Sequence, residues 1–499
     1  MALASLISRG QRGMDAYEVT VEVHLAGGLP TFTISGLPAA AVRESRDRVR
    51  AALETFGSPV PVSRITAHLG PADIPKEGGR FDLPIALGVL IADKGRTWQT
   101  DGTEFIGELA LNGDLRPVQG ALPAVLAARE AGRAIVIPAG NTPEAALVDD
   151  ATVYPASRLS DIVAHLDGSA RLARLLPIPA AAASTDALEL TDVRGQSVAK
   201  RALIIAAAGG HNLLLVGPPG AGKSMLAQRL PGLLPPLRTE EMLCVASIAS
   251  IAARPSAEVA STRRPFRAPH HTASAVALVG GGSRPRPGEI SLAHLGVLFL
   301  DELPEFQRSA LEALREPLES GVITVARANE TSRFPAAFQL VAAMNPCPCG
   351  YLGDRSDRCR CSETRLAQYR SRLSGPLLDR FDLQVGLSRV PLARIVDQVP
   401  DGGSTEAAAS ISAARERQLN RRGMLNARLG DRALWREVPL SSDGRRLLIR
   451  AAEQWRLSAR SCTRILKVAR TIADLAAAPD VAVPHVAEAI QMRCLDRRL

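Results

Sequence analysis

Alternation of apolar and polar residues marks the first part of the chain. Because side chains on a strand point alternately to two faces, the pattern predicts strands at 17–24, 31–34 and 105–111. Two stretches with helical spacing predict helices, at 39–56 and 121–131. Residues 1–170 are therefore expected to form a mixed α/β domain.

Short, largely apolar, strand-like runs characterise residues 188–387, at 212–216, 297–300 and 339–344. Buried strands that alternate with helical stretches predict a parallel, doubly wound sheet. The Pro- and Ala-rich stretch 171–187 has no clear period and is expected to be a linker. Residues 388–499 show no strand signal and predict a small all-α domain, with helices at 406–421, 442–454, 459–476 and 484–494.

Charge and composition narrow the class of protein. The chain has 499 residues and a net charge of +9, which permits an anionic partner such as nucleic acid without requiring one. Aromatic residues make up 3%, so nucleic-acid contacts would depend on phosphates more than on base stacking. No apolar run reaches the roughly 18 residues of a membrane span, and the N-terminus turns polar too soon for a secretory signal. We expect a cytoplasmic protein that does not enter a membrane.

The apolar run at 212–216 leads into a loop that matches the pattern G-x-x-x-x-G-K-[ST] and precedes a helical stretch. The loop consists of Gly217, Pro218, Pro219, Gly220, Ala221, Gly222, Lys223 and Ser224. Glycines in such a loop let backbone N–H groups close around phosphates. Lys223 is expected to reach the β- and γ-phosphates of ATP, and the Ser224 hydroxyl to hold Mg²⁺.

Two further strands of the expected sheet end in polar residues. The run at 297–300 leads into Asp301 and Glu302, and the run at 339–344 leads into Asn345. Ligands of such folds sit at the carboxyl ends of the strands. We expect Asp301 to complete the magnesium shell, Glu302 to polarise the attacking water and Asn345 to orient it. The alternatives are an exposed acidic turn and a plain Asx-turn.

Four of the seven cysteines form the pattern C-x-C-x₉-C-x-C, namely Cys347, Cys349, Cys359 and Cys361. Four thiolates at this spacing can form a tetrahedral Zn²⁺ site. C-x-C is a less usual half-site than C-x-x-C, so free thiols or a redox pair are alternatives. An odd number of cysteines in a reducing compartment makes a disulfide framework unexpected.

The order of these motifs, followed by an all-α end, resembles AAA+ ATPases. Several stretches are more specifically similar to the magnesium-chelatase-like ComM/YifB family: FRAPHHTAS (266–274), GEISLAHLGVLFLDELPEF (288–306), MNPCPCGYLGD (344–354), YRSRLSGPLLDRFDL (369–383) and LSARSCTRILKVARTIADL (457–475). This family is linked to natural transformation, and its ComM members are regarded as hexameric helicases that drive branch migration. The resemblance implies a ring, most simply a hexamer, that acts on single-stranded or branched DNA.

The resemblance also implies roles for two arginines. Arg380, in the stretch Asp-Arg-Phe-Asp, resembles an arginine finger that reaches the γ-phosphate of a neighbouring subunit. Arg460 resembles the sensor-2 arginine, with Arg464 as a rival one helical turn on. Arginine suits both roles because its charge is permanent and its fork spans two phosphate oxygens. The alternative for each is an ordinary surface ion pair.

Two loops are candidates for DNA contacts. Helicase-type relatives insert a hairpin between the Asp-Glu strand and the Asn-ended strand and aim it into the ring pore, which would bring Arg327 and Arg333 to DNA phosphates. A solvated hairpin is the alternative. The adjacent His270 and His271 point apart in regular structure, so we expect a loop in the pore or the helix insert there and not a metal pair.

Residues 1–170 resemble the Lon-protease-like (ribosomal protein S5 domain 2-like) domain of this family and of the RadA recombination protein. Arg80 stands where the nucleophilic serine would be, and Leu122 where the catalytic lysine would be. Without hydroxyl or amine there is no Ser–Lys dyad, so we expect a binding or assembly module. The competing function is a magnesium-chelatase-type motor subunit that remodels a protein partner, and a non-catalytic scaffold is a third class.

Overall fold

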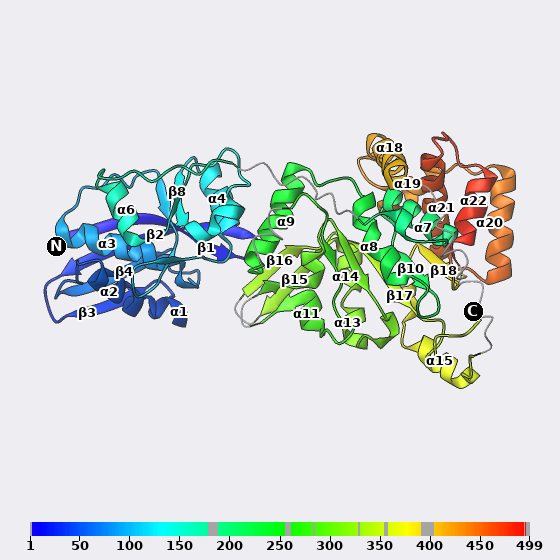
Figure 1. Ribbon diagram of the computed structural model, residues 1–499, viewed down its shortest axis with the longest axis horizontal. Coiled ribbons are helices and arrows are strands. Elements are labelled where there is room, and N and C mark those ends of the chain that lie inside the picture. Colours follow the sequence, from blue (N-terminus) through cyan, green and yellow to red (C-terminus); the bar gives the residue numbers. More distant parts are fainter. Residues whose placement is uncertain are drawn as a thin grey trace. The chain divides into compact units, whose positions relative to one another are not determined.

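The computed structural model of the chain (Figure 1) describes residues 2–177, 188–254, 261–282, 285–327, 330–353, 358–390, 404–493 and 495. The chain forms two compact units. The first contains Met1–Ala182, Thr239–Thr262 and Ala326–Phe334, and the second contains Ala183–Arg238, Arg263–Val325 and Pro335–Leu499. Residues 178–187, most of the expected linker, lie outside the described residues.

The first unit is built on a seven-stranded mixed sheet in the order β3-β4-β2-β1-β5-β8-β9. Its strands are β1 Ala2–Arg12, β2 Asp15–Ala26, β3 Thr31–Ser35, β4 Arg64–Gly70, β5 Thr103–Phe105, β8 Ala134–Pro138 and β9 Val153–Ala156. Alternate residues of β2, among them Val19, Val21 and Val23, are buried in the core. The strands expected at 17–24 and 31–34 are therefore confirmed as β2 and β3.

The helices of this unit are α1 Ala40–Arg43, α2 Ser45–Thr55, α3 Asp82–Lys94, α4 Ala121–Glu130, α5 Thr142–Ala145 and α6 Leu159–Leu166, with the 3₁₀ turns η1 Gly79–Phe81 and η2 Ala139–Asn141. The helix expected at 121–131 is confirmed as α4. The helix expected at 39–56 is divided at Glu44 into α1 and α2.

The prediction of one strand over 105–111 is wrong. β5 ends at Phe105, and a separate pair forms from β6 Glu108–Leu109 and β7 Leu115–Arg116. Gly107 lies at the break, where its N–H donates to the carbonyl of Arg80 (2.9 Å). A Cβ at Gly107 would lie only 2.7 Å from Cδ2 of Leu115, so a larger residue at this turn would require the Leu115 side chain to move.

The second unit contains a five-stranded parallel sheet in the order β11-β14-β17-β10-β18. Its strands are β10 Leu213–Val216, β11 Phe266–Arg267, β14 Val297–Leu300, β17 Gln339–Met344 and β18 Leu383–Gly386. The three expected apolar strands are confirmed as β10, β14 and β17, each buried along its whole length. Since β17 pairs with both β10 and β14, the carboxyl ends of all three meet at one edge. This sheet is consistent with the expected P-loop AAA+ fold.

The strands of this unit alternate along the chain with helices and short 3₁₀ turns. They are η3 Leu190–Asp192, α7 Ser197–Gly209, α8 Lys223–Leu233, α11 Ala275–Val279, α12 Glu289–Leu292, η4 Leu303–Glu305, α13 Arg308–Glu312, α14 Arg315–Ser320, α15 Glu363–Ser371 and α16 Gly375–Leu378. The two-residue strands β12 Gly280–Gly281 and β13 Arg286–Pro287 form a small hairpin. Helix α8 packs against β14 and β17, and α7 packs against β10 and β18.

The C-terminal region is all-α, as expected (Figure 1, orange to red). Its elements are α18 Ser404–Arg422, η5 Asn426–Arg428, α19 Asp431–Glu437, α20 Ser442–Trp455, α21 Ala459–Leu475 and α22 Val483–Gln491. Ile465 and Leu466 of α21 share one hydrophobic core with Leu203 of α7 and Leu215 of β10. Burial against the sheet unit thus stabilises these helices, at about 25 cal/mol for each Å² of apolar surface removed from water.

Helix α9 Thr239–Ile251 folds with the first unit, although its sequence lies inside the expected ATPase core. It packs against α4, and the carbonyl of Ser250 accepts from the N–H of Gly120 (3.2 Å). The hairpin of β15 Val322–Arg327 and β16 Glu330–Pro335 also reaches the first unit, where Cβ of Ser332 lies 3.1 Å from the place of a Cβ at Gly13. Among the described helices, none combines the length and apolar character that crossing a bilayer requires.

Candidate nucleotide site and cysteine centre

The loop at 217–222 joins the buried end of β10 to the start of α8. Gly220 and Gly222 have φ angles of 78° and 88°, a left-handed region that suits glycine, and a Cβ at either would face open space. Helix α8 has 11 residues and begins directly after the loop, so its unsatisfied N–H groups and positive dipole end adjoin it. This part of the chain fits a phosphate group.

Lys223 and Asn345 meet beside this loop. The buried ammonium of Lys223 donates to the carbonyls of Gly217 (2.6 Å) and Pro218 (3.1 Å) and to Oδ1 of Asn345 (3.0 Å). Burial lowers the pKa of Lys223, partly offset by the charges of Asp301 and Glu302. The Lys223 ammonium thus donates to three protein oxygens. Phosphate oxygens can replace these acceptors, so the arrangement suits a β- or γ-phosphate.

Ser224 and Asp301 form the second pair at this sheet edge. The hydroxyl of Ser224, in the first turn of α8, donates to Oδ2 of Asp301 at the end of β14 (2.6 Å). Hydroxyl and carboxylate oxygens are ligands that Mg²⁺ prefers, and it commonly binds through one or two of them together with water and phosphate. Both side chains therefore fit a magnesium site, as expected from the sequence.

Glu302 lies next to this pair and contacts a residue that the sequence did not assign to the site. Its side chain is half exposed, and its Oε2 lies 3.1 Å from Nδ1 of His271. Its backbone has a φ of 52°, which is uncommon outside glycine and often marks a functional position. Because β11 runs parallel to β14, the residues after its carboxyl end reach the same edge. Recognition of β11 as an edge strand would have placed His271 there.

The expected arginines differ in their surroundings. Arg380 forms an ion pair with Glu319 at the end of α14. Arg460 is exposed at the start of α21. Arg464, the rival for the sensor-2 role, instead pairs with the buried carboxylate of Asp382. Of the two candidates on α21, the side chain of Arg460 is therefore the one that faces solvent.

The four clustered cysteines come together as expected. All four Sγ atoms lie within 4.8 Å of one another. Sγ of Cys347 lies 3.3 Å from that of Cys349 and 3.8 Å from that of Cys359. A tetrahedral zinc with Zn–S distances of about 2.3 Å separates its sulfur atoms by roughly 3.8 Å. A hydrogen bond from the backbone of Tyr351 lowers the pKa of Cys349 to about 6, whereas burial raises the pKa of Cys347. The cluster fits zinc.

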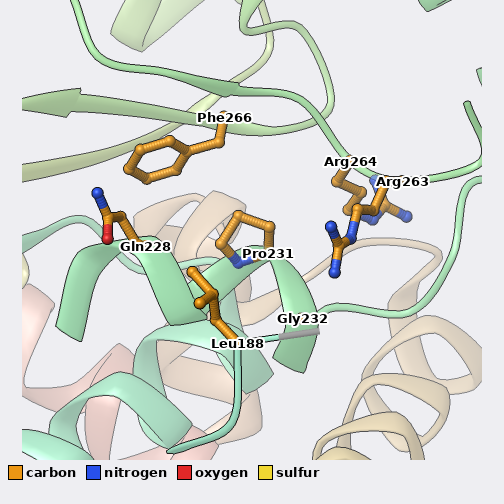
Figure 2. Close-up of a pocket in the computed structure, with 7 residues that line it drawn as sticks. All are labelled: Leu188, Gln228, Pro231, Gly232, Arg263, Arg264 and Phe266. Carbon is orange, nitrogen blue, oxygen red and sulfur yellow. The ribbon is translucent and has the colours of Figure 1, made fainter. Parts of the chain in front are cut away.

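The two candidate DNA-contacting residues belong to the strands of the β15–β16 hairpin. The side chain of Arg327 is outside the described residues, and Arg333 is exposed on β16. The second unit also has a cavity of about 280 Å³. Figure 2 shows the residues that line it: Leu188, Gln228, Pro231, Gly232, Arg263, Arg264 and Phe266. It shares no residue with the phosphate loop, and Arg264 there donates to the carbonyls of Pro235 (2.7 Å) and Leu295 (2.8 Å).

Arg80 and Leu122, which stand where the serine and the lysine of the Lon dyad would be, are both buried in the first unit. Arg80 donates to the carbonyls of Gln119 and Arg9. Burial lowers the pKa of Arg80 to about 10, well above neutral pH, so the guanidinium remains charged. Leu122 is fully enclosed at the start of α4.

Family models cover most of the chain. Those described as "Magnesium chelatase, subunit ChlI", "Subunit ChlI of Mg-chelatase" and "Magnesium chelatase, subunit ChlI C-terminal" match residues 189–395, 21–141 and 402–493. Lon protease 2 of Syntrophobacter fumaroxidans is 33% identical over 117 residues, which are 22% of this chain and 15% of that protein.

Similarity to two bacterial proteins extends over the full length. The competence protein ComM of Haemophilus influenzae is 48% identical over 511 residues, covering 100% of this chain and 99% of that protein. The uncharacterized protein YifB of Salmonella typhimurium is 46% identical over 502 residues, covering 100% and 98%. With the P-loop, the parallel sheet and the cysteine cluster in place, this chain belongs to the ComM/YifB family of magnesium-chelatase-like proteins.

Proposed function

We propose that this protein is an ATPase that assembles into a ring, most simply a hexamer, and drives branch migration of DNA during recombination in natural transformation. One observation carries the ATPase: Lys223 and Asn345 are hydrogen-bonded at the sheet edge where Ser224 is bonded to Asp301. The family, whose model covers this segment, supports the same chemistry.

Each side chain at this edge has a chemical task. Lys223 exchanges its carbonyl acceptors for β- and γ-phosphate oxygens, and the start of α8 supplies N–H donors. Mg²⁺, held by Ser224 and Asp301, neutralises phosphate charge when it is bound. Glu302 polarises the attacking water, and Asn345 orients that water from the neighbouring strand.

The ring supplies the parts that one chain lacks. Arg380 of one subunit reaches the γ-phosphate bound to the next, and Arg460 contacts the nucleotide of its own or an adjacent subunit. A permanent positive charge near the γ-phosphate stabilises the charge that develops in the transition state. Nucleotide binding and assembly are therefore coupled.

DNA, single-stranded or branched, is the proposed track. Full-length similarity to a competence protein, the net charge of +9 and the exposed Arg333 support this choice. Arg327 and Arg333 contact phosphates, so binding depends little on sequence. The second candidate is a magnesium-chelatase-type motor subunit that remodels a protein, and the three family models named after such a subunit favour it.

Zn²⁺ is the proposed occupant of the four-cysteine cluster, because the thiols lie within tetrahedral reach of one another. A reducing compartment keeps these thiols from forming disulfides, so that they can bind metal, and the proposed reaction also requires ATP. We therefore place the protein in the cytoplasm.

The test is ATP turnover by the full-length protein without DNA and with single-stranded, branched and fully paired DNA. Turnover should rise several-fold, most with branched DNA, while Glu302→Gln stays inactive throughout and controls for contaminating ATPases. Arg333→Ala should keep basal turnover and lose the stimulation. If no DNA binds or stimulates an active enzyme, the DNA track is wrong and the chelatase-type function gains support.

A further inference from the structure

The cysteine cluster and the phosphate site share one loop. Asn345, which accepts from Lys223, precedes the buried Cys347 by two residues. The loop then turns back on Cys347: its carbonyl accepts from the N–H of Gly350 (2.9 Å), and its sulfur accepts from the N–H of Leu352 (3.3 Å). The position of Cys347 therefore determines the path of the chain directly after Asn345.

Gly350 brings this loop into contact with the phosphate loop. A Cβ at Gly350 would lie 2.7 Å from Cδ of Pro219 and 3.8 Å from Cγ of Asn345. The first distance is below any normal carbon–carbon contact of about 3.5 Å, so only glycine fits. Its φ of +83° also favours glycine. The backbone between two cysteines thus packs against one residue of the phosphate loop and approaches Asn345.

The other end of the cysteine loop is fixed to the same site. Cys361 is followed by Ser362, which caps α15 by accepting the N–H of Arg365 (3.4 Å). Tyr369 of this helix is buried, which raises the pKa of its hydroxyl to about 12, and the nearby backbone of Asn345 partly offsets this increase. Both arms that carry the cysteines therefore converge on Asn345.

We propose that the four-cysteine centre controls ATP turnover: with Zn²⁺ bound, it holds Asn345 and Pro219 in their active positions, and loss of the metal releases them. This inference rests on the proposed zinc centre. The physical reason is that four metal–sulfur bonds hold two chain segments that contain little regular structure. Without the metal, hydrogen bonds of about 1 kcal/mol each remain.

The first experiment removes zinc from the full-length protein with a chelator selective for zinc over magnesium. Metal analysis, circular dichroism, binding of a fluorescent ATP analogue and steady-state turnover are measured before and after. Turnover should fall at least about tenfold in protein that remains folded, since a displacement of about 1 Å at a catalytic group can cost about a hundredfold. Restored zinc should recover the rate.

The second experiment changes the contact and leaves every thiol in place. Gly350→Ala should lose turnover to a similar extent and retain its zinc, because the new Cβ displaces the loop from Pro219. Gly353→Ala is the matched control: Gly353 also has a positive φ, +77°, but a Cβ there meets no atom of the described residues within 4 Å. It should retain turnover, which separates the contact from backbone strain.

The outcomes separate the two proposals. Folded, zinc-free protein with unchanged turnover and nucleotide affinity overturns the coupling, as does equal behaviour of Gly350→Ala and Gly353→Ala. Protein purified without added zinc that contains none, and takes up none, overturns the zinc centre and with it control by metal. A loss confined to Gly350→Ala supports the loop contact.

Discussion

Lys223 is bonded to three oxygen atoms of its own chain, whereas the carboxylate of Glu302 contacts a single histidine, and this difference separates their expected roles. Lys223 meets charge that is already present on bound phosphate. Glu302 acts on a water that becomes nucleophilic only during the reaction. Substitutions at the two positions should therefore affect different kinetic constants.

Lys223→Ala is expected to weaken ATP binding, because a permanent charge against the phosphates is lost. Glu302→Gln is expected to bind ATP normally and to hydrolyse it at least about a hundredfold more slowly, the usual contribution of a general base. Equilibrium binding of a fluorescent ATP analogue and steady-state turnover measure the two effects. Wild-type turnover in Glu302→Gln would show that the base lies elsewhere.

His271 is expected to position Glu302. His271→Ala should lower kcat by roughly tenfold with little change in KM, because the carboxylate loses its orientation but ATP keeps its phosphate contacts. His271→Asn, which retains a donor, should recover part of the rate. His270→Ala removes a ring whose centroid lies 4.1 Å from that of His271 and which is bonded to Thr272 (2.9 Å); it should have a smaller effect, because the contact of His271 with Glu302 stays in place. Equal kinetics for both alanine variants would rule out a specific role for His271.

At the scale of elements, the buried carboxylate of Asp382 links helix α21 to the sheet, in addition to their shared hydrophobic core. Asp382, directly before β18, pairs with Arg464 of α21 and lies 3.4 Å from Nδ1 of His211, just before β10. Burial would raise the pKa of Asp382, but the nearby imidazole of His211 and the charge of Arg464 outweigh it and lower the pKa far below its usual range. The pair joins the C-terminal helices to the core.

Asp382→Asn is expected to destabilise the protein by about 3 kcal/mol, because it leaves buried partners without their counter-charge. Since the folded-state pKa is below the unfolded value of about 4, this stabilisation is complete above that pH and lost as the pH falls below it. The difference in unfolding temperature from wild type should therefore shrink at low pH. Asp443→Asn, at an exposed pair with Arg446, should change little at any pH. A difference independent of pH would exclude the charge as its cause.

At the scale of the whole molecule, the compact units do not follow the order of the sequence. Helix α9 and part of the β15–β16 hairpin lie within the ATPase segment of the sequence but fold with the N-terminal unit. Arg380, the expected arginine finger, forms an ion pair with Glu319 of its own chain. A role as a finger requires this pair to open when a second subunit docks.

Arg380→Ala is expected to bind ATP and to lose turnover, since the finger stabilises charge that develops in the transition state. Mixing it with Glu302→Gln subunits should restore part of the activity, because an intact finger on one chain can face an intact base on the next. Turnover of the wild type should rise more steeply than linearly with protein concentration. A monomer that remains monomeric with nucleotide and DNA and is fully active would contradict the shared site.

Local pattern predicted much of the ATPase unit. An apolar run followed by glycines and a Lys-Ser pair specifies a strand, a tight loop and a helix through short-range geometry, so the pattern correctly predicted β10 and α8 and the loop between them. The same holds for the cysteines, whose spacing limits how far apart they can lie. The prediction of one strand over 105–111 failed where the chain makes a distant contact: β5 ends at Phe105, and the N–H of Gly107 donates to the carbonyl of Arg80.

The sequence by itself therefore determined the family, the parallel sheet, the helical end and the residue types at the phosphate site. Only the tertiary structure decided that His271 reaches Glu302, that Gly350 packs against Pro219, that Arg464 is committed to Asp382, and that α9 belongs to the first unit. The physical reason is that pattern and propensity act over a few residues. The packing of strand ends and loops instead depends on which distant segments share a buried surface.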